Sequence, residues 1–381
     1  MPEAVAKSSS WQYERREFFG GSKMYIALYI SSHGFGHMTR CLGIIENILK
    51  MSDYNLYIVC GKRQNEFAKI YLTNYKDRVI YKDLVTDIGL VNKENSLEVD
   101  KLSLEQQLLR FTSSWNDVVN DEYDFLKNLN IKCIVSDISP IGTLVGNKLQ
   151  LPVVLITNFT WVEQYEYIGI DESIINKYRQ AYSYVTKFIK YDLCLPISSV
   201  NCEEVYEVGF TCREIDLDKV EKIKKQYGKS IMVTCGKSAN LNTINIKNFK
   251  GTIFTTSGID ITCEEDCNVV NLPINILDTQ NYIAASHIVI TKAGWGTIGE
   301  AVLGHTNLVL IERPSAKEDS FNIEKIKENK LGISIAEKDL ATIDIQNLEN
   351  ELKNNIDYEK LNTYKNDVSK IVELILAKVH I

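Results

Sequence analysis

Two histidines, two glycines and an arginine lie within the segment Ser31–Arg40, whose sequence is SSHGFGHMTR. Glycine permits a tight turn, and the free backbone N–H groups at the start of a following helix favour an anion or a developing oxyanion. Histidine titrates near neutral pH, so His37 can act as a general base, and His33 is a second candidate. Alternatively, each imidazole only caps the helix or hydrogen-bonds within the turn. The dinucleotide fingerprint GxGxxG does not fit, because it needs a third glycine at Thr39.

A carboxylate follows a second apolar run. Asp137 comes directly after Cys133–Ser136. At the end of a strand, an Asp can accept a hydrogen bond from a histidine in a neighbouring loop, which sets the tautomer and stabilises the imidazolium. Alternatively, Asp137 caps a helix that begins near Pro140. The two roles are compatible.

A third segment, Thr291–Glu300, has the sequence TKAGWGTIGE and follows the apolar run His287–Thr291. Glycines, a hydroxyl group and a lysine at the start of a helix suit a diphosphate, and Glu300, one turn further on, can accept hydrogen bonds from two ribose hydroxyls. A glycine-rich turn that merely ends a strand would account for part of this pattern.

The longer segment Asn271–Asn322 resembles the nucleotide-sugar-binding box of glycosyltransferases with the two-domain GT-B fold. In plant-type members this box runs Thr-His-Cys-Gly-Trp-Asn-Ser, then two residues and Glu, and later Asp-Gln, two residues and Asn. The matching or equivalent positions here are Lys292 in place of the diphosphate-binding His, Gly294, Trp295, Thr297 in place of Ser, and Glu300. Glu318 and Asp319 stand where the family has Asp-Gln, so the resemblance assigns them to the donor sugar and leaves that sugar open.

The N-terminal half carries an independent resemblance. His37 falls where these enzymes keep the catalytic base, and Asp137 falls where plant-type members keep the supporting acid. Three stretches resemble the glycosyltransferase-like N-terminal region of L-arabinokinases: His33–Arg40, Val135–Asp137 through Thr157–Trp161, and Thr86–Val91. On the acceptor side, the resulting candidates are His33, Asp87, Phe159 and Trp161.

Two further elements resemble bacterial cell-wall (lipid II-forming) N-acetylglucosaminyltransferases. Val208–Arg213 resembles their Val-Gly-x-Pro-x-Arg element, and Cys235–Ser238 resembles the first glycine loop of the donor domain. A solvated loop lysine is the alternative for Lys237. The predicted contacts to the donor nucleotide and diphosphate are Gly36, Gly236, Lys237, Lys292, Gly294, Trp295, Gly296, Thr297 and Glu300.

These resemblances imply a metal-independent, inverting glycosyltransferase of the hexosyl or N-acetylhexosaminyl type. The donor is expected to be a nucleotide sugar, with UDP as its nucleotide, the acceptor is a hydroxyl group, and no further cofactor is implied. No DxD-type acidic pair follows a donor-domain strand. One alternative is a nucleotide-sugar hydrolase related to the pseudaminic acid pathway enzyme, whose Gly-Phe-Gly-His-x-x-Arg pattern is similar. The other is a catalytically inactive sugar-nucleotide-binding protein, which the joint presence of His37, Asp137 and Glu300 disfavours.

Short apolar runs that alternate with helical stretches must position these loops. The runs are Tyr25–Ile30, Leu56–Cys60, Cys133–Ser136, Val153–Thr157, Ser230–Cys235, Thr252–Thr256, Asn268–Leu272, His287–Thr291 and Asn307–Ile311. This pattern predicts an α/β protein with two Rossmann-like domains, whose parallel sheets face each other across a cleft. The predicted divisions are an extension at 1–23, an acceptor-side domain at 24–207, a connection at 208–228, a nucleotide-sugar domain at 229–356 and a packing helix at 357–381.

The composition excludes several other classes. The 381 residues are 45% hydrophobic and 24% charged, with a net charge of −7. The chain has no dense Lys/Arg block of the kind that binds nucleic acid or anionic lipid. No apolar window is long enough for a membrane span, and the N-terminus lacks the apolar core of a secretory signal. The nine cysteines are scattered, and Cys263 and Cys267 lack a second ligand pair, so reduced thiols, no metal site and a cytoplasmic location are expected.

Overall fold

The computed structural model describes residues 23–93, 98–234, 243–256, 258–273 and 275–378. Apart from Lys23, the predicted N-terminal extension lies outside these residues. Within them, the chain forms two large parallel sheets and one small parallel sheet. The predicted α/β class with two parallel sheets is confirmed.

The first sheet has seven strands in the order β3-β2-β1-β4-β5-β6-β7. Its strands are β1 (Met24–Ile30), β2 (Asn55–Cys60), β3 (Val79–Asp83), β4 (Asn130–Asp137), β5 (Val153–Thr157), β6 (Lys187–Lys190) and β7 (Glu204–Glu207). All six residues of β2 and all five of β5 are buried, as expected for parallel strands with a helical layer on each face. The pairing of β1 with β4 places Ile30 beside Asp137, so the loops after these two strands are neighbours.

Helices connect these strands. They are α1 (Gly36–Met51), α2 (Lys62–Tyr71), the 3₁₀ helix η1 (Thr73–Arg78), α3 (Lys101–Ser113), α4 (Trp115–Leu126), α5 (Pro140–Leu149), α6 (Trp161–Ile168) and α7 (Glu172–Tyr182). Helix α1 buries Leu42, Ile45 and Ile48 against the sheet, at the spacing of one helical face. Helix α6 begins at a capping box, in which the Thr160 side chain accepts from the helix start and Glu163 reaches back to the cap.

The second large sheet has the order β12-β10-β8-β13-β14-β15, and the small sheet has the order β11-β9-β16. Their strands are β8 (Ser230–Thr234), β9 (Ile244–Lys247), β10 (Thr252–Thr255), β11 (Ile261–Cys263), β12 (Asn268–Asn271), β13 (Ile288–Lys292), β14 (Asn307–Ile311), β15 (Gly332–Ile335) and β16 (Thr342–Asp344). The helices of this half are α8 (Leu217–Tyr227), α9 (Thr279–Ala285), α10 (Trp295–Leu303), α11 (Lys317–Glu328), η2 (Glu337–Asp339), α12 (Ile345–Asn355), α13 (Tyr358–Leu361) and α14 (Val368–Ala377).

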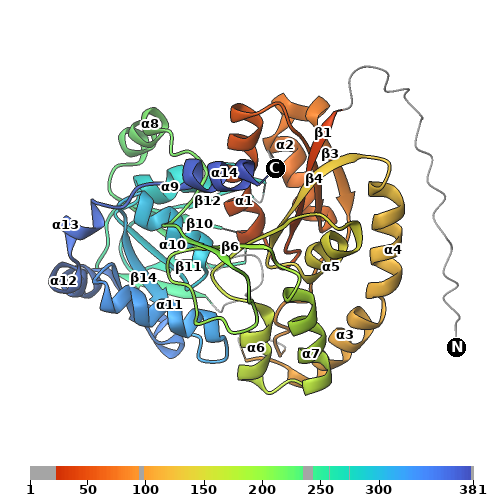
Figure 1. Ribbon diagram of the computed structural model, residues 1–381. Coiled ribbons are helices and arrows are strands. Elements are labelled where there is room, and N and C mark those ends of the chain that lie inside the picture. Colours follow the sequence, from red (N-terminus) through yellow and green to blue (C-terminus); the bar gives the residue numbers. More distant parts are fainter. Residues whose placement is uncertain (1–22, 94–97, 235–242, 257, 274, 379–381) are drawn as a thin grey trace, which may run out of the picture.

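The two halves lie side by side, and the end of the chain returns from the second half to the first (Figure 1). Helix α14 packs against α1, and Lys187 at the start of β6 donates to the carbonyl of Leu374 in α14 at 2.9 Å. The predicted connection 208–228 contains helix α8, which packs on α9 of the second half. The exact domain boundaries stay a prediction.

Candidate active site

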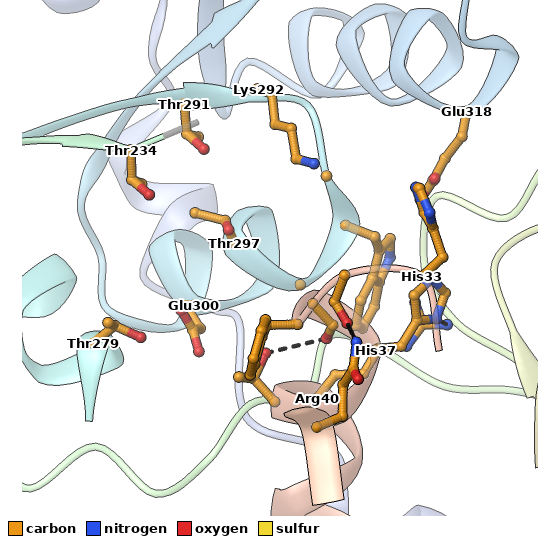
Figure 2. Close-up of a pocket in the computed structure, with 18 of the residues that line it drawn as sticks. His33, His37, Arg40, Thr234, Thr279, Thr291, Lys292, Thr297, Glu300 and Glu318 are labelled. Carbon is orange, nitrogen blue, oxygen red and sulfur yellow. Dashed lines mark hydrogen bonds between the residues drawn. The ribbon is translucent and has the colours of Figure 1, made fainter. Parts of the chain in front are cut away.

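A cleft of about 610 Å³ is lined by post-strand loops of both halves. Ligands of open α/β sheets bind outside the carboxyl ends of the strands, so this is the expected place for a site. Most of the residues singled out from the sequence line it: His33, Gly36, His37, Phe159, Trp161, Lys292, Gly294, Trp295, Gly296, Thr297, Glu300, Glu318 and Asp319. Figure 2 shows Lys292, Thr297 and Glu300 on one side, and His33, His37 and Arg40 on the other.

The loop between β1 and α1 is held from two directions. The backbone N–H of Ser32 donates to Asp87 Oδ1 at 3.0 Å, and Gln64 Nε2 donates to the carbonyls of Ser32 and Gly34 at 2.9 Å each. Gly34 has a φ of +76°, a left-handed conformation that glycine adopts without strain. These contacts fix the start of α1, and with it His37 in the first helical turn.

His37 lies against a buried carboxylate. Its Nδ1 is 2.9 Å from Oδ1 of Asp137, the last residue of β4. Arg40, one turn along α1, donates from Nε to Asp137 Oδ2 at 2.7 Å and from Nη2 to Asp137 Oδ1, and its Nη2 also lies 2.9 Å from His37 Nδ1. The Cys41 thiol donates to Asp137 Oδ2 at 2.9 Å. Asp137 is therefore a fully engaged acceptor that orients the imidazole.

The alternative role for Asp137 as a helix cap is wrong. The cap of α5 is Ser139, whose side chain accepts from the backbone N–H of Gly142. Burial alone would raise the pKa of the Asp137 carboxyl, but the Arg40 guanidinium and His37 outweigh burial and hold that pKa well below its ordinary value. Asp137 therefore stays ionised beside His37.

The other histidine of the loop, His33, also lines the cleft. A Cβ added to Gly89 would lie 1.8 Å from His33 Nδ1, so only a glycine fits beneath this ring. The ring meets Trp161 edge-on, with centroids 6.1 Å apart. Burial and the charges of Lys292, His37 and Arg313 lower the pKa of His33 to about 3. His33 is therefore neutral at pH 7 and available for hydrogen bonding.

Of the acceptor-side candidates, Phe159 and Trp161 line the cleft, but Asp87 does not. Asp87 is buried behind the first loop, where its Oδ2 accepts from Trp161 Nε1 at 3.0 Å and its Oδ1 accepts from Ser32. Its role in the structure is thus to support the loop and the indole.

On the other side of the cleft, Lys292 ends β13 and α10 begins three residues later. The starts of α1 and α10 approach each other closely, because a Cβ added to Gly296 would lie 3.2 Å from the carbonyl oxygen of Gly36. Trp295 is almost fully buried between the two halves; its Nε1 donates to the carbonyl of Asp192 at 2.7 Å. The indole ring thus packs between the domains. The N-termini of α1 and α10 line the same cleft, and helix N-termini favour anions.

The predicted ribose carboxylate has a buried partner. Arg213 Nη2 donates to Glu300 Oε1 at 2.7 Å and to Thr279 Oγ1 at 2.9 Å. The Arg213 side chain is 1% exposed, so this ion pair is almost fully removed from water. Pro273, Ile276 and Thr279 also line the cleft.

The two acids assigned to the donor sugar lie in the first turn of α11. Glu318 Oε1 accepts from Asn158 Nδ2 at 2.9 Å, which is a contact between the two halves. Asp319 is buried 4.0 Å from Arg313. Burial, reinforced by the Glu318 carboxylate, raises the pKa of Asp319 to about 6.

Three residues of the site lacked an assigned role in the sequence. Arg40, Asn158 and Arg213 are buried and polar, and each contacts a carboxylate that the sequence singled out. The spacing of Arg40 from His37 by three positions was the available signal, because such residues share a helix face. Gly236 and Lys237 lie outside the described residues.

The described residues contain neither a membrane-spanning helix nor a cluster of metal-ligating side chains. No helix there has both the length and the apolar character needed to cross a bilayer. Within the same ranges, His, Cys, Asp and Glu side chains form no group of three or more that could hold a metal ion.

Residues 24–353 match the family described as Glycosyl transferase family 1. Among curated proteins, an L-arabinokinase of Arabidopsis thaliana is 23% identical over 335 residues, which are 83% of this chain and 31% of that protein. The chain therefore spans about a third of that relative. An uncharacterized glycosyltransferase of Methanosarcina acetivorans is 23% identical over 334 residues, which are 81% of this chain and 85% of that protein.

Solved structures with the same fold include UGT89C1 of Arabidopsis thaliana complexed with UDP-L-rhamnose, with a TM-score of 0.64, 11% identity and coverage of 94% of this chain and 99% of that one. UGT2 of Phytolacca americana, complexed with UDP-2fluoro-glucose and pterostilbene, has a TM-score of 0.61, 10% identity and coverage of 94% and 100%. At these identities the likeness establishes the fold, and it confirms the expected GT-B arrangement. With the match of the family across residues 24–353, the chain belongs to glycosyl transferase family 1.

Proposed function

We propose that this protein transfers a hexosyl or N-acetylhexosaminyl group from a UDP-sugar to a hydroxyl acceptor, with inversion at the anomeric carbon and without a metal ion. The observation that carries the proposal is that His37, held by Asp137, lines the same cleft as Lys292 and the start of α10. In a single displacement reaction, a base can deprotonate the acceptor while an anion site in the same cleft stabilises the leaving diphosphate.

His37 is the proposed general base. With Nδ1–H donated to Asp137, Nε2 is the nitrogen that remains to take the proton of an acceptor hydroxyl. The acceptor oxygen then attacks the anomeric carbon as the bond from that carbon to the diphosphate oxygen breaks, and the bonding electrons leave with UDP. Because the acceptor and the leaving group lie on opposite faces of the sugar, one displacement inverts the anomeric configuration.

The leaving diphosphate is held by Lys292, Thr297 and the backbone N–H groups at the start of α10, close to Gly36 of α1. Positive charge and preorganised N–H groups stabilise the charge that develops on the leaving oxygen. Glu300 accepts hydrogen bonds from the ribose hydroxyls, and Arg213 fixes the orientation of the Glu300 carboxylate. The choice of UDP is supported by the UDP-sugar complexes of structurally similar proteins.

The test begins with thermal shift against a panel of nucleotide sugars, because a ligand at 100 times its Kd adds about 2.7 kcal/mol of stability. UDP release from the best binder is then measured with and without hydroxyl acceptors, and the anomeric proton of the product is assigned by NMR. We expect slow release alone, at least about tenfold faster release with a suitable acceptor, and an inverted product, because a transferase excludes water from the activated carbon.

The hydrolase alternative predicts a different result. Free sugar would be released at about 10 per second, the median turnover of enzymes, at a rate that no acceptor changes and that His37→Ala abolishes. An inactive sugar-nucleotide-binding protein would bind the nucleotide sugar and release no UDP under any condition.

A further inference from the structure

The start of α11 is fastened to the N-terminal half by three polar side chains. Asn158 Nδ2 donates to Glu318 Oε1 at 2.9 Å, Gln164 Oε1 accepts from the backbone N–H of Lys317 at 2.9 Å, and the Tyr167 hydroxyl donates to the carbonyl of Pro314 at 3.0 Å. All three come from the loop after β5 or from α6. The helix that carries the predicted sugar-binding acids is therefore docked on the half that carries the base.

Asn158 also contacts Arg40, which holds the Asp137 carboxylate beside His37. Its Oδ1 accepts from Arg40 Nη1 at 3.1 Å, and Arg40 Nε donates to Asp137 Oδ2 at 2.7 Å. Asn158 is fully buried and Arg40 is 3% exposed. A continuous chain of hydrogen bonds thus runs from Glu318 through Asn158, Arg40 and Asp137 to His37.

The chemistry at this position requires a primary amide. One neighbour, Glu318, needs a donor, and the other, Arg40, needs an acceptor, so the orientation of the Asn158 amide is determined by its partners. A carboxylate in its place would satisfy Arg40 and repel Glu318. An apolar residue would leave a buried guanidinium N–H without its acceptor, which is costly.

We propose that Asn158 is a positioning residue for sugar transfer, which aligns Glu318 with the His37–Asp137 pair when the two domains are closed. This inference rests on the proposed function. The hydrogen bond from Asn158 to Glu318 joins the two halves, so it forms only while they are docked. In the closed state it fixes the position of α11 relative to His37. An error of about 1 Å in such alignment lowers turnover by about 100-fold.

The test compares the wild type with Asn158→Asp, Glu318→Ala and the double variant Asn158→Asp/Glu318→Gln. In the double variant the introduced amide on α11 donates to the introduced carboxylate after β5, which restores a bond of reversed polarity. Hydrogen exchange is followed over residues 314–319, and UDP affinity and turnover of the best UDP-sugar are measured. The control is Asn128→Asp, the same chemical change at an exposed position.

We expect exchange over 314–319 to rise about tenfold in Asn158→Asp and in Glu318→Ala, and to return toward the wild-type rate in the double variant. In Asn158→Asp, kcat should fall about 10- to 100-fold while the Kd of UDP changes by less than about twofold. The control should match the wild type. If Asn158→Asp fails to fold, Glu318→Ala still removes the same contact, because it changes the partner that is partly exposed.

Unchanged exchange in both single variants, or a double variant no closer to the wild type than Asn158→Asp, would overturn the role of Asn158. A fall in UDP affinity equal to the fall in kcat would also overturn it, because that result indicates general damage to the cleft. A wild type that transfers no sugar would refute the proposed function instead, and the exchange comparison would still decide whether Asn158 fastens α11.

Discussion

His37 and Asp137 are one hundred positions apart in the chain, and His37 Nδ1 lies 2.9 Å from Asp137 Oδ1. The other oxygen of this carboxylate, Oδ2, accepts from Arg40 Nε and from the Cys41 thiol. The imidazole is thus held at the cleft by a buried carboxylate that Arg40 and Cys41 fix in place. This relationship leads to the first two predictions.

Replacing His37 with Ala should lower turnover by about 10²- to 10⁴-fold and leave UDP affinity nearly unchanged, because in the proposed reaction the base acts on the acceptor and the diphosphate binds elsewhere in the cleft. Steady-state kinetics and calorimetric titration with UDP measure the two effects. His287→Ala, at a half-exposed histidine of the second half, is the matched control. Near-normal turnover in His37→Ala would remove His37 from its role.

Arg40→Met should destabilise the fold by about 3–5 kcal/mol, because it leaves the Asp137 carboxylate buried without its cation. Urea denaturation at pH 7 gives the free energy of unfolding. Arg179→Met removes an arginine whose two ion pairs are at the surface, so it should cost only about 0–1 kcal/mol. Equal losses of unfolding free energy in the two variants would show that the buried ion pair contributes no more to stability than the surface ion pairs.

Lys292→Ala and Glu300→Gln should weaken donor binding in different ways. In the proposed function Lys292 faces the phosphates, so its loss should spare uridine, weaken UDP and reduce the salt dependence of UDP binding. Glu300 is the proposed ribose contact, so Glu300→Gln should weaken the binding of uridine and UDP alike. Gln keeps an acceptor for the buried Arg213. Titrations with uridine and UDP at two salt concentrations provide the comparison, and identical profiles would show that the two roles are misassigned.

Asp319→Asn should change how stability depends on pH. The pKa of Asp319 is about 6 in the folded protein against an ordinary value of 3.8, so between these values the folded state binds more protons than the unfolded state. Wild-type stability therefore falls through this group as the pH rises from about 4 to 6, and levels off above 6. Relative to the wild type, Asp319→Asn should gain about 2–3 kcal/mol between pH 4 and pH 7.

Urea titrations across this pH range measure that difference for Asp319→Asn, with the exposed Asp124→Asn as the control. Wild-type and Asp319→Asn stabilities that run parallel from pH 4 to pH 7 would contradict the raised pKa.

The sequence by itself determined the local elements and the loops that carry chemistry. The apolar runs predicted β5 at Val153–Thr157 and β14 at Asn307–Ile311 to the residue, and β1 and β2 to within one residue, because a strand covered by helices on both faces must be apolar throughout. Glycines and histidines after β1 marked the first loop, and glycines with a lysine at the end of β13 marked the third, since turn geometry depends on neighbouring residues.

Tertiary structure alone decided which side chains meet. Asp137 reaches His37 because β4 lies next to β1, and no spacing along the chain specifies that neighbour. Asp87 is as polar as Asp137, yet it faces Ser32 and Trp161 behind the cleft. The contact of Asn158 with Glu318 depends on how two domains dock. Contacts between residues distant in sequence are set by the packing of whole layers, so residue types predict the chemistry of this site, and the fold selects the partners.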